Sequence, residues 1–293
     1  MPGSSKTFDF LSIHSSISLS LKLLDIKEKN SFVTMCSFET IHMKVTLLGT
    51  GTSTPDPERV QAGILIELEN NRILFDIGPG TYYRMNQLGF DLATISSIFI
   101  THFHVDHCSD FVMLCQSLWL HGHDNQLNVY GPPFIETWWR GIFDISYPYA
   151  KGRLKLEPII LDEREEVHLD GAVVTNVATI HSTIDTCALK LEAEGKTVVY
   201  SADTAPSDKI INLAKGADLL IHECNWLDGA HPEGVHTSPS QLADIVEAAQ
   251  PKKVVLTHLT PEVIEHRDTV IEIVKQRTKA EVVLGEDLMS IVL

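Results

Sequence analysis

The heptapeptide Thr101–His107 (Thr-His-Phe-His-Val-Asp-His) constrains this chain more than any other stretch. It follows a short apolar run that is typical of a buried strand. Because successive side chains of a strand point to opposite faces, His102 and His104 lie on the same side and can bind one cation. Asp106 and His107 come after the strand, where the chain turns, and can face a second cation. The spacing His-x-His-x-Asp-His therefore predicts a site for zinc or a similar transition ion, in preference to a polar loop that is rich in histidine by chance.

Later parts of the chain offer the further ligands that two metal sites would need. Four ligands from one loop cannot complete both sites, so others must come from elsewhere in the chain. Three candidates each come directly after an apolar, strand-like stretch: His181, Asp203 and His258. A single histidine at the end of a strand would usually be structural, but three such positions in a chain with this loop favour a shared metal centre.

The order of strand-like and helix-like stretches repeats along the chain. Residues 72–102 show a strand, a helix, a strand and a histidine, and residues 197–222 show the same order. Residues 253–258, followed by another helix, are a partial third copy, and a further helix is expected over residues 106–120. Residues 165–192 alternate in the manner of an antiparallel sheet. We therefore expect an α/β fold, a four-layer αβ/βα sandwich in which two sheets pack together with helices outside.

The composition favours an acidic globular protein without a membrane span. Acidic residues outnumber basic ones by 39 to 23, which gives a formal net charge of −16. Such a surface repels phosphate backbones, so general nucleic-acid binding is disfavoured, although two divalent cations would offset part of the excess. No apolar run approaches the roughly 18 residues that cross a bilayer. The five cysteines are odd in number and show no paired spacing, which is typical of reduced thiols in a cytoplasmic protein.

Residues 1–42 differ from the rest of the chain. They are rich in serine, lack the basic start of a signal peptide, and contain no arginine, which a mitochondrial presequence would carry. We interpret them as a poorly ordered extension that precedes a natural start at Met43. An arm that packs on a partner subunit is the alternative.

The ligand pattern of residues 43–293 resembles that of the metallo-β-lactamase superfamily, and more closely its ribonuclease Z-like branch. Four short motifs support the branch, the last of them loosely: Leu47–Gly51, Phe75–Gly78, His222–Asn225 and His236–Ser238. The resemblance implies a hydrolase domain with the metallo-β-lactamase fold and two metal ions. It implies this ligand set: His102, His104 and His181 on one metal, Asp106, His107 and His258 on the other, and Asp203 bridging the two.

One feature of the branch is missing. Members that process tRNA precursors carry a long basic, glycine-rich arm, commonly between the fifth ligand and the bridging aspartate. Here only residues 182–202 lie in that interval, enough for a hairpin and no arm. This argues against tRNA binding and favours a small-molecule or nucleotide phosphodiester as substrate. The resemblance also implies a homodimer.

The implied chemistry is phosphodiester hydrolysis by a hydroxide that bridges two divalent ions, most simply Zn²⁺, with Mn²⁺ or Fe²⁺ as alternatives. Asp106 belongs to this catalytic set. His236, helped by Glu223, is the expected proton donor to the leaving group, since histidine titrates in the right range. The alternative for His236 is a structural position next to a helix start.

Two other functions compete with this one. The same metals could hydrolyse a lactone, a thioester or a sulfate ester. The second alternative is a non-enzymatic metal-binding protein, and the complete ligand set argues against it.

Overall fold

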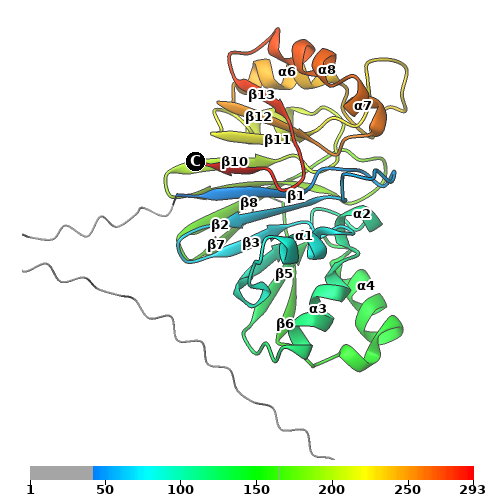
Figure 1. The fold of residues 1–293 in the computed structure, drawn as a ribbon, viewed down its shortest axis with the longest axis vertical. Coiled ribbons are helices and arrows are strands. Elements are labelled where there is room, and N and C mark those ends of the chain that lie inside the picture. Colours follow the sequence, from blue (N-terminus) through cyan, green and yellow to red (C-terminus); the bar gives the residue numbers. More distant parts are fainter. Residues whose placement is uncertain (1–41, 164) are drawn as a thin grey trace, which may run out of the picture. The chain divides into compact units, whose positions relative to one another are not determined.

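Two seven-stranded sheets stack face to face in the computed structural model, which describes residues 42–163 and 165–293 (Figure 1). The first sheet has the order β14-β1-β2-β3-β4-β5-β6. Its neighbours are antiparallel from β14 to β3 and parallel from β3 to β6. The strands are β1 (Lys44–Gly49), β2 (Gly63–Glu67), β3 (Arg72–Phe75), β4 (Ser97–Phe99), β5 (Leu127–Gly131), β6 (Leu156–Ile160) and β14 (Ser290–Val292).

The second sheet has the order β13-β12-β11-β10-β9-β8-β7. The four strands from β13 to β10 are parallel, and those from β10 to β7 form antiparallel pairs, as expected for residues 165–192. The strands are β7 (Glu166–Leu169), β8 (Ala172–Ala178), β9 (Cys187–Ala193), β10 (Lys196–Tyr200), β11 (Leu219–Glu223), β12 (Lys253–Thr257) and β13 (Glu281–Leu284).

Alternating apolar side chains bury both faces of each sheet. In β3, Phe75 points between the sheets and Leu74 points to the outer face. In β10, Tyr200 points between the sheets and stacks on Phe75, with 6.5 Å between ring centroids, whereas Val199 faces outward. Strands that are apolar on both faces need cover on both sides, so the chain must add helices outside the sheets.

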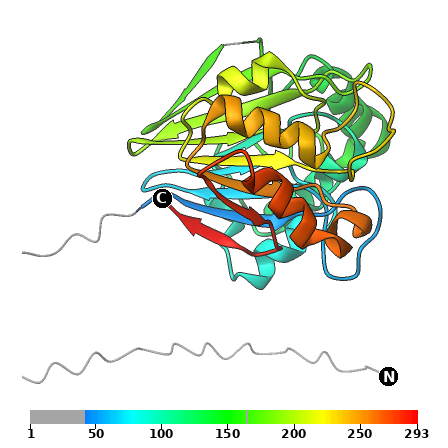
Figure 2. The same cartoon turned by 90° about the horizontal axis from the view of Figure 1, so that it is seen from above.

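Helices supply that cover, which completes the predicted four-layer sandwich. Figure 1 places α3 and α4 outside the first sheet and α6 and α8 outside the second, and Figure 2 shows α6 and α8 side by side. The α-helices are α1 (Thr81–Gln87), α2 (Val105–Cys108), α3 (Phe111–Leu120), α4 (Ile135–Arg140), α5 (Asp208–Leu213), α6 (Pro239–Ala249), α7 (Pro261–Glu265) and α8 (Arg267–Lys275). Three shorter helical turns are η1 (Leu92–Thr94), η2 (Gly141–Ser146) and η3 (Pro148–Ala150).

The single helix expected over residues 106–120 is wrong, because the chain breaks between α2 and α3. The backbone N–H of Asp110 donates to the carbonyl of Ile77 instead of a carbonyl one turn earlier (3.1 Å). The Asp110 carboxylate accepts the N–H groups of Gly80 and Tyr82 at the start of α1 (2.8 and 3.0 Å). The break therefore ties the histidine-rich stretch to the neighbouring helix.

Two further expectations concern the N-terminal extension and the absence of a membrane span. The prediction for residues 1–42 lies outside the described residues, apart from His42. Within the described residues, no helix is both long and apolar enough to cross a membrane.

Gly78 lies where two backbones approach so closely that no side chain fits. A Cβ at this position would overlap the backbone oxygen of Asp106. The N–H of the neighbouring residue Ile77 donates to the carbonyl of His107 (2.8 Å). The close approach at Gly78 therefore holds Asp106 and His107 of α2 in place.

We predict that Gly78→Ala lowers the free energy of unfolding by about 1–3 kcal/mol, because overpacking must push α2 away. Thermal or urea unfolding measures it. Gly141→Ala is the matched control, since its Cβ would meet nothing within 4 Å and its backbone is already helical. Equal stability of the two variants would show that the approach at Gly78 is not tight.

Candidate metal centre

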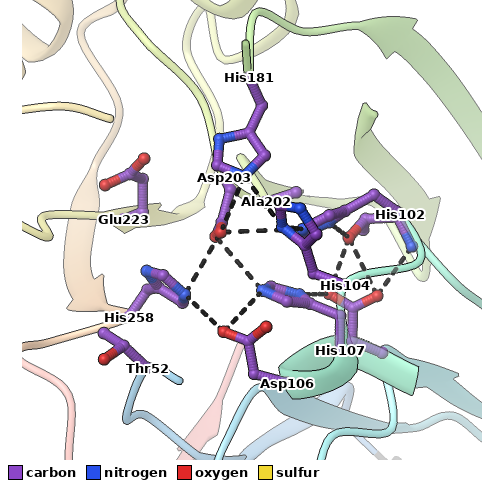
Figure 3. A network of polar contacts seen from close by, with 12 residues as sticks. Thr52, His102, His104, Asp106, His107, His181, Ala202, Asp203, Glu223 and His258 are labelled. Carbon is purple, nitrogen blue, oxygen red and sulfur yellow. Dashed lines mark hydrogen bonds and ion pairs between the residues drawn. The ribbon is translucent and has the colours of Figure 1, made fainter. Parts of the chain in front are cut away.

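Loops that follow strands of both sheets bring all seven predicted ligands to one place (Figure 3). β4 leads into the stretch with His102 and His104, and α2 carries the next two candidates. His181 follows β8, Asp203 follows β10 and His258 follows β12. Three groups of side chains have donor atoms within 4.8 Å of one another. The first is His102, His104, His181 and Asp203, the second is Asp106, His107 and His258, and a third joins Asp203 and His258 to His236.

The first group is arranged around three imidazoles. His104 Nδ1 lies 3.2 Å from His102 Nε2 and 3.2 Å from His181 Nε2. Asp203 Oδ2 lies 3.8 Å from His102 Nε2 and 3.7 Å from His181 Nε2. These four donor atoms surround a single point.

The second group shares Asp203 with the first. Asp106 Oδ2 lies 3.3 Å from His258 Nε2 and 3.9 Å from His107 Nε2. Asp203 Oδ2 lies 3.3 Å from His258 Nε2, and Asp203 Oδ1 lies 3.4 Å from His107 Nε2. Asp203 therefore contacts donors of both groups, as a bridging carboxylate would.

The spacing of the donor atoms fits transition ions. Ligand atoms about 2.0–2.1 Å from a tetrahedral Zn²⁺ are about 3.4 Å from one another. The hydrogen-bonded and ion-paired donor atoms here are 3.2 to 3.9 Å apart, and all donor atoms of a group lie within 4.8 Å of one another. His107 Nε2 and Asp203 Oδ1 are also buried without a hydrogen bond of good geometry, a state that a shared cation would relieve.

Outer hydrogen bonds point the ring nitrogens toward the centre. Asp76 Oδ2 accepts a hydrogen bond from His107 Nδ1 at 2.7 Å, and the Val235 carbonyl accepts one from His181 Nδ1 at 2.9 Å. In each ring the other nitrogen, Nε2, faces the cluster, and it carries the lone pair when the ring is neutral. Asp76 therefore supports a candidate ligand and does not cap α1, where Gly80 occupies the N-cap position.

The backbone adopts a costly conformation at three positions around the centre. Asp76, Ala202 and His258 have φ angles of 57°, 52° and 55°, in the left-handed region that residues other than glycine rarely adopt. Each follows a strand that leads to the cluster: β3, β10 and β12. Such strain typically gathers at functional sites, where the rest of the fold holds it in place.

The buried carboxylates of the cluster are stabilised by nearby positive charge. Burial raises the pKa of Asp203, but His258 and His107 outweigh it and bring the pKa well below its usual range. The same balance, through His258 and His107, lowers the pKa of Asp106. For His107, burial lowers the pKa, yet Asp203 and Asp76 raise it well above its ordinary value. Buried carboxylates this close together are costly unless protons or metal ions neutralise them.

The predicted proton donor lies beside this cluster. His236 Nδ1 is hydrogen-bonded to Glu223 Oε1 at 2.8 Å, and its ring centroid lies 4.9 Å from that of His181 and 5.3 Å from that of His258. Burial, and then Asp203, raise the pKa of Glu223. The N-cap of α6 is Ser238, two residues after His236, and the His236 ring faces the rings of His181 and His258.

Comparison with known proteins identifies the family. Residues 43–279 match the family described as anti-Pycsar protein Apyc1. The chain belongs to this Apyc1 family. It is 27% identical to the ribonuclease Z of Methanosarcina acetivorans, covering 85% of this chain and 97% of that protein. The ribonuclease Z of Methanothermobacter thermautotrophicus is also 27% identical, over 85% and 96%.

Solved structures place this Apyc1 family member among metallo-β-lactamase fold proteins. The Bacillus subtilis protein YhfI, described as having that fold, aligns with a TM-score of 0.74 at 24% identity, over 85% of this chain and 98% of that one. The short form of human tRNase Z aligns with a TM-score of 0.68 at 25% identity, over 85% and 98%. The predicted fold and the ribonuclease Z-like resemblance are confirmed, and the chain is a hydrolase that depends on divalent metal ions.

Two supports of the centre in this Apyc1 family member are not apparent from the sequence. Tyr200 donates a hydrogen bond to Asp76 Oδ2 at 3.0 Å, and Val235 acts through its carbonyl. A phenol at an inward position of an apolar strand is a weak signal for the first. A backbone carbonyl leaves no sequence signal, because every residue carries one.

We predict that Asp76→Asn weakens metal binding by about 10- to 100-fold, because it removes the acceptor that orients His107. Zinc titration against a competing chelator measures the affinity. Asp91→Asn is the matched control, since Asp91 is exposed and only caps η1. Unchanged affinity in Asp76→Asn would contradict the role assigned to Asp76.

Proposed function

We propose that this chain is a phosphodiesterase that holds two divalent cations, most simply Zn²⁺, in the ligand set expected from the sequence. The observation that carries the proposal is the position of Asp203, whose carboxylate lies between two groups of donor atoms. Its Oδ2 is 3.7 Å from His181 Nε2 and 3.3 Å from His258 Nε2. A carboxylate in this position can hold both cations at a fixed separation.

Two cations held in this way would lower the pKa of a shared water toward neutrality and polarise the scissile phosphoryl oxygen. The chain's own residues set the geometry. The lowered pKa of Asp203 and of Asp106 favours their ionised forms, which can hold positive charge next to the reacting phosphate. Asp76 and the Val235 carbonyl keep two rings in the orientation that presents their lone pairs.

His236 is proposed to protonate the leaving oxygen. Glu223 holds its Nδ1 and is itself fixed by the N–H groups of Thr204 (2.9 Å) and Asn225 (3.1 Å). With Nδ1 engaged, Nε2 is the nitrogen that remains to exchange a proton with the substrate. His236 is thus held by Glu223, and Glu223 is held by two backbone N–H groups. A proton donor positioned in this way needs little reorganisation during the reaction.

The proposed substrate is a small phosphodiester, for example one of a nucleotide. After His181, the chain enters β9 at Cys187 and returns in β10, so the interval before Asp203 forms a hairpin. A long basic arm is absent from that interval, and the net charge of −16 gives no general attraction for nucleic acid. The homodimer implied by the resemblance stays a prediction.

We predict that metal-loaded protein hydrolyses bis(p-nitrophenyl) phosphate, that chelation abolishes the activity, and that His104→Ala lowers kcat/KM by about 10³-fold or more, as loss of an essential ion requires. Release of p-nitrophenolate and metal content per chain are the measurements. His121→Ala is the control, because His121 is exposed and its ring is hydrogen-bonded to the Ser117 carbonyl, outside the centre. Turnover of lactones, thioesters or aryl sulfates without any phosphodiester turnover would overturn the proposal.

For His236→Ala we predict a fall in kcat of about 10²- to 10⁴-fold on a diester with a poor alkoxide leaving group. The loss should be much smaller with p-nitrophenolate, which leaves without a proton. Metal content should stay that of the unmodified protein. Equal losses on both substrates, or loss of metal, would assign His236 a structural role.

A further inference from the structure

The loop of residues 50–62, which joins β1 to β2, runs beside the backbone of His258. The carbonyl of Thr50 accepts the N–H of Leu259 at 2.9 Å, and Gly51 forms an isolated parallel bridge with Leu259. Leu259 directly follows His258, whose φ of 55° lies in the left-handed region. The loop therefore contacts the backbone that must keep His258 in a costly conformation.

The other end of this loop contacts Asp106. The N–H of Ala62 donates to the carbonyl of Asp106 at 3.2 Å. Asp106 Oδ2 lies 3.3 Å from His258 Nε2, so the loop links the backbones of two candidate ligands that face each other. Within residues 42–163 and 165–293, none of the hydrogen bonds joins this loop to the three histidines of the first group.

One carboxylate, that of Asp287 between β13 and β14, holds both limbs of the loop. Asp287 Oδ1 accepts the N–H and the hydroxyl of Thr50, at 3.0 and 2.8 Å. Asp287 Oδ2 accepts the N–H of Val60 at 2.8 Å and two N–H groups of Arg84 in α1, at 3.2 and 2.9 Å. Only 6% of the Asp287 side chain is exposed, and hydrogen bonds to an ionised group are stronger than neutral ones.

These contacts leave Asp287 no direct part in the chemistry. Both of its oxygens already accept hydrogen bonds from the protein, and the residue belongs to none of the three groups of candidate ligands. Any influence of Asp287 on the centre must therefore pass through the loop that it holds.

The Leu47–Gly51 motif fits this arrangement, because the two limbs of the loop lie in direct contact. A Cβ at Gly49 would overlap the carbonyl oxygen of Gln61, and a Cβ at Gly51 would lie 3.1 Å from the carbonyl oxygen of Val60. The N–H of Gly51 donates to that same carbonyl at 2.9 Å. A displacement of one limb would therefore move the other, and with it the backbone contacts to both ligands.

We propose that Asp287 is a positioning residue for the second cation and that it acts through the loop of residues 50–62. This cation is the one expected on Asp106, His107 and His258. The inference rests on the proposed function, because that function supplies the centre with two cations. It adds an asymmetry: the loop holds the second site and leaves the first to its own supports.

The test is Zn²⁺ titration of the full chain against a competing chelator, fitted with two binding constants. Asp287→Asn keeps the shape of the side chain but presents an NH₂ group to neighbours that are themselves donors. It should weaken one of the two constants about tenfold and leave the other unchanged. In His258→Ala protein, which lacks a ligand of the second group, Asp287→Asn should no longer change the affinity for the remaining ion.

A second, milder variant is Arg84→Gln, because Arg84 is half-buried and the backbone bonds of Asp287 remain. It should weaken the same constant by a smaller factor. The matched control is Asp218→Asn at the start of β11. Asp218 also accepts a backbone N–H, from Thr197 at 2.9 Å, and a cationic group, from Lys252 at 2.7 Å. Its loss should leave both constants unchanged.

Three results would overturn the inference. They are unchanged constants in Asp287→Asn, an equal loss in both constants, which would show general damage to the centre, and a loss that persists in His258→Ala protein. If Asp287→Asn does not fold, unchanged constants in Arg84→Gln have the same meaning. If the unmodified protein binds fewer than two cations or has no phosphodiesterase activity, the proposed function itself fails, and this outcome is distinct from the others.

Discussion

The buried carboxylate of Asp203 is the constraint on which the rest of the structure depends. It lies within 3.8 Å of ring nitrogens from His102, His107, His181 and His258, which come from loops of both sheets. An unpaired buried carboxylate would be costly, so the segments that follow β4, β8, β10 and β12 must converge for the fold to tolerate it. The same convergence creates a centre with donors at metal-ligand spacing. The stability of the fold and the chemistry of the site thus both require these segments to converge on Asp203.

The core between the sheets supports this convergence directly. Asp76 leaves the end of β3 in the first sheet, and Tyr200 ends β10 in the second, yet the two side chains are hydrogen-bonded. Asp76 also accepts the N–H and the hydroxyl of Thr101, the residue before His102. The apolar packing that joins the sheets therefore extends into the hydrogen bonds that orient the candidate ligands, and a shift of one sheet would displace the centre.

The side of the centre occupied by His236 differs from the rest. The cluster itself is polar and buried, whereas an adjoining cavity has a mixed lining that includes the apolar side chains of Trp226 and Pro206, and most of it comes from the segment between β11 and α6. The same fold appears in the short form of human tRNase Z and in YhfI, so the fold alone does not choose a substrate. Substrate choice belongs to such connecting segments, which vary without disturbing the ligands.

The sequence by itself determined the ligand-rich stretch, the strand ends that carry His181, Asp203 and His258, and the layered α/β architecture. These features depend on local spacing and on side-chain alternation, which a linear sequence displays. Only the tertiary structure decided which histidine Asp76 orients, that Val235 orients His181, and that α2 and α3 are separate helices. It also decided that Trp226 lines a cavity beside His236. Each of these depends on contacts between residues far apart in the chain or on backbone groups common to all residues, and neither leaves a local pattern.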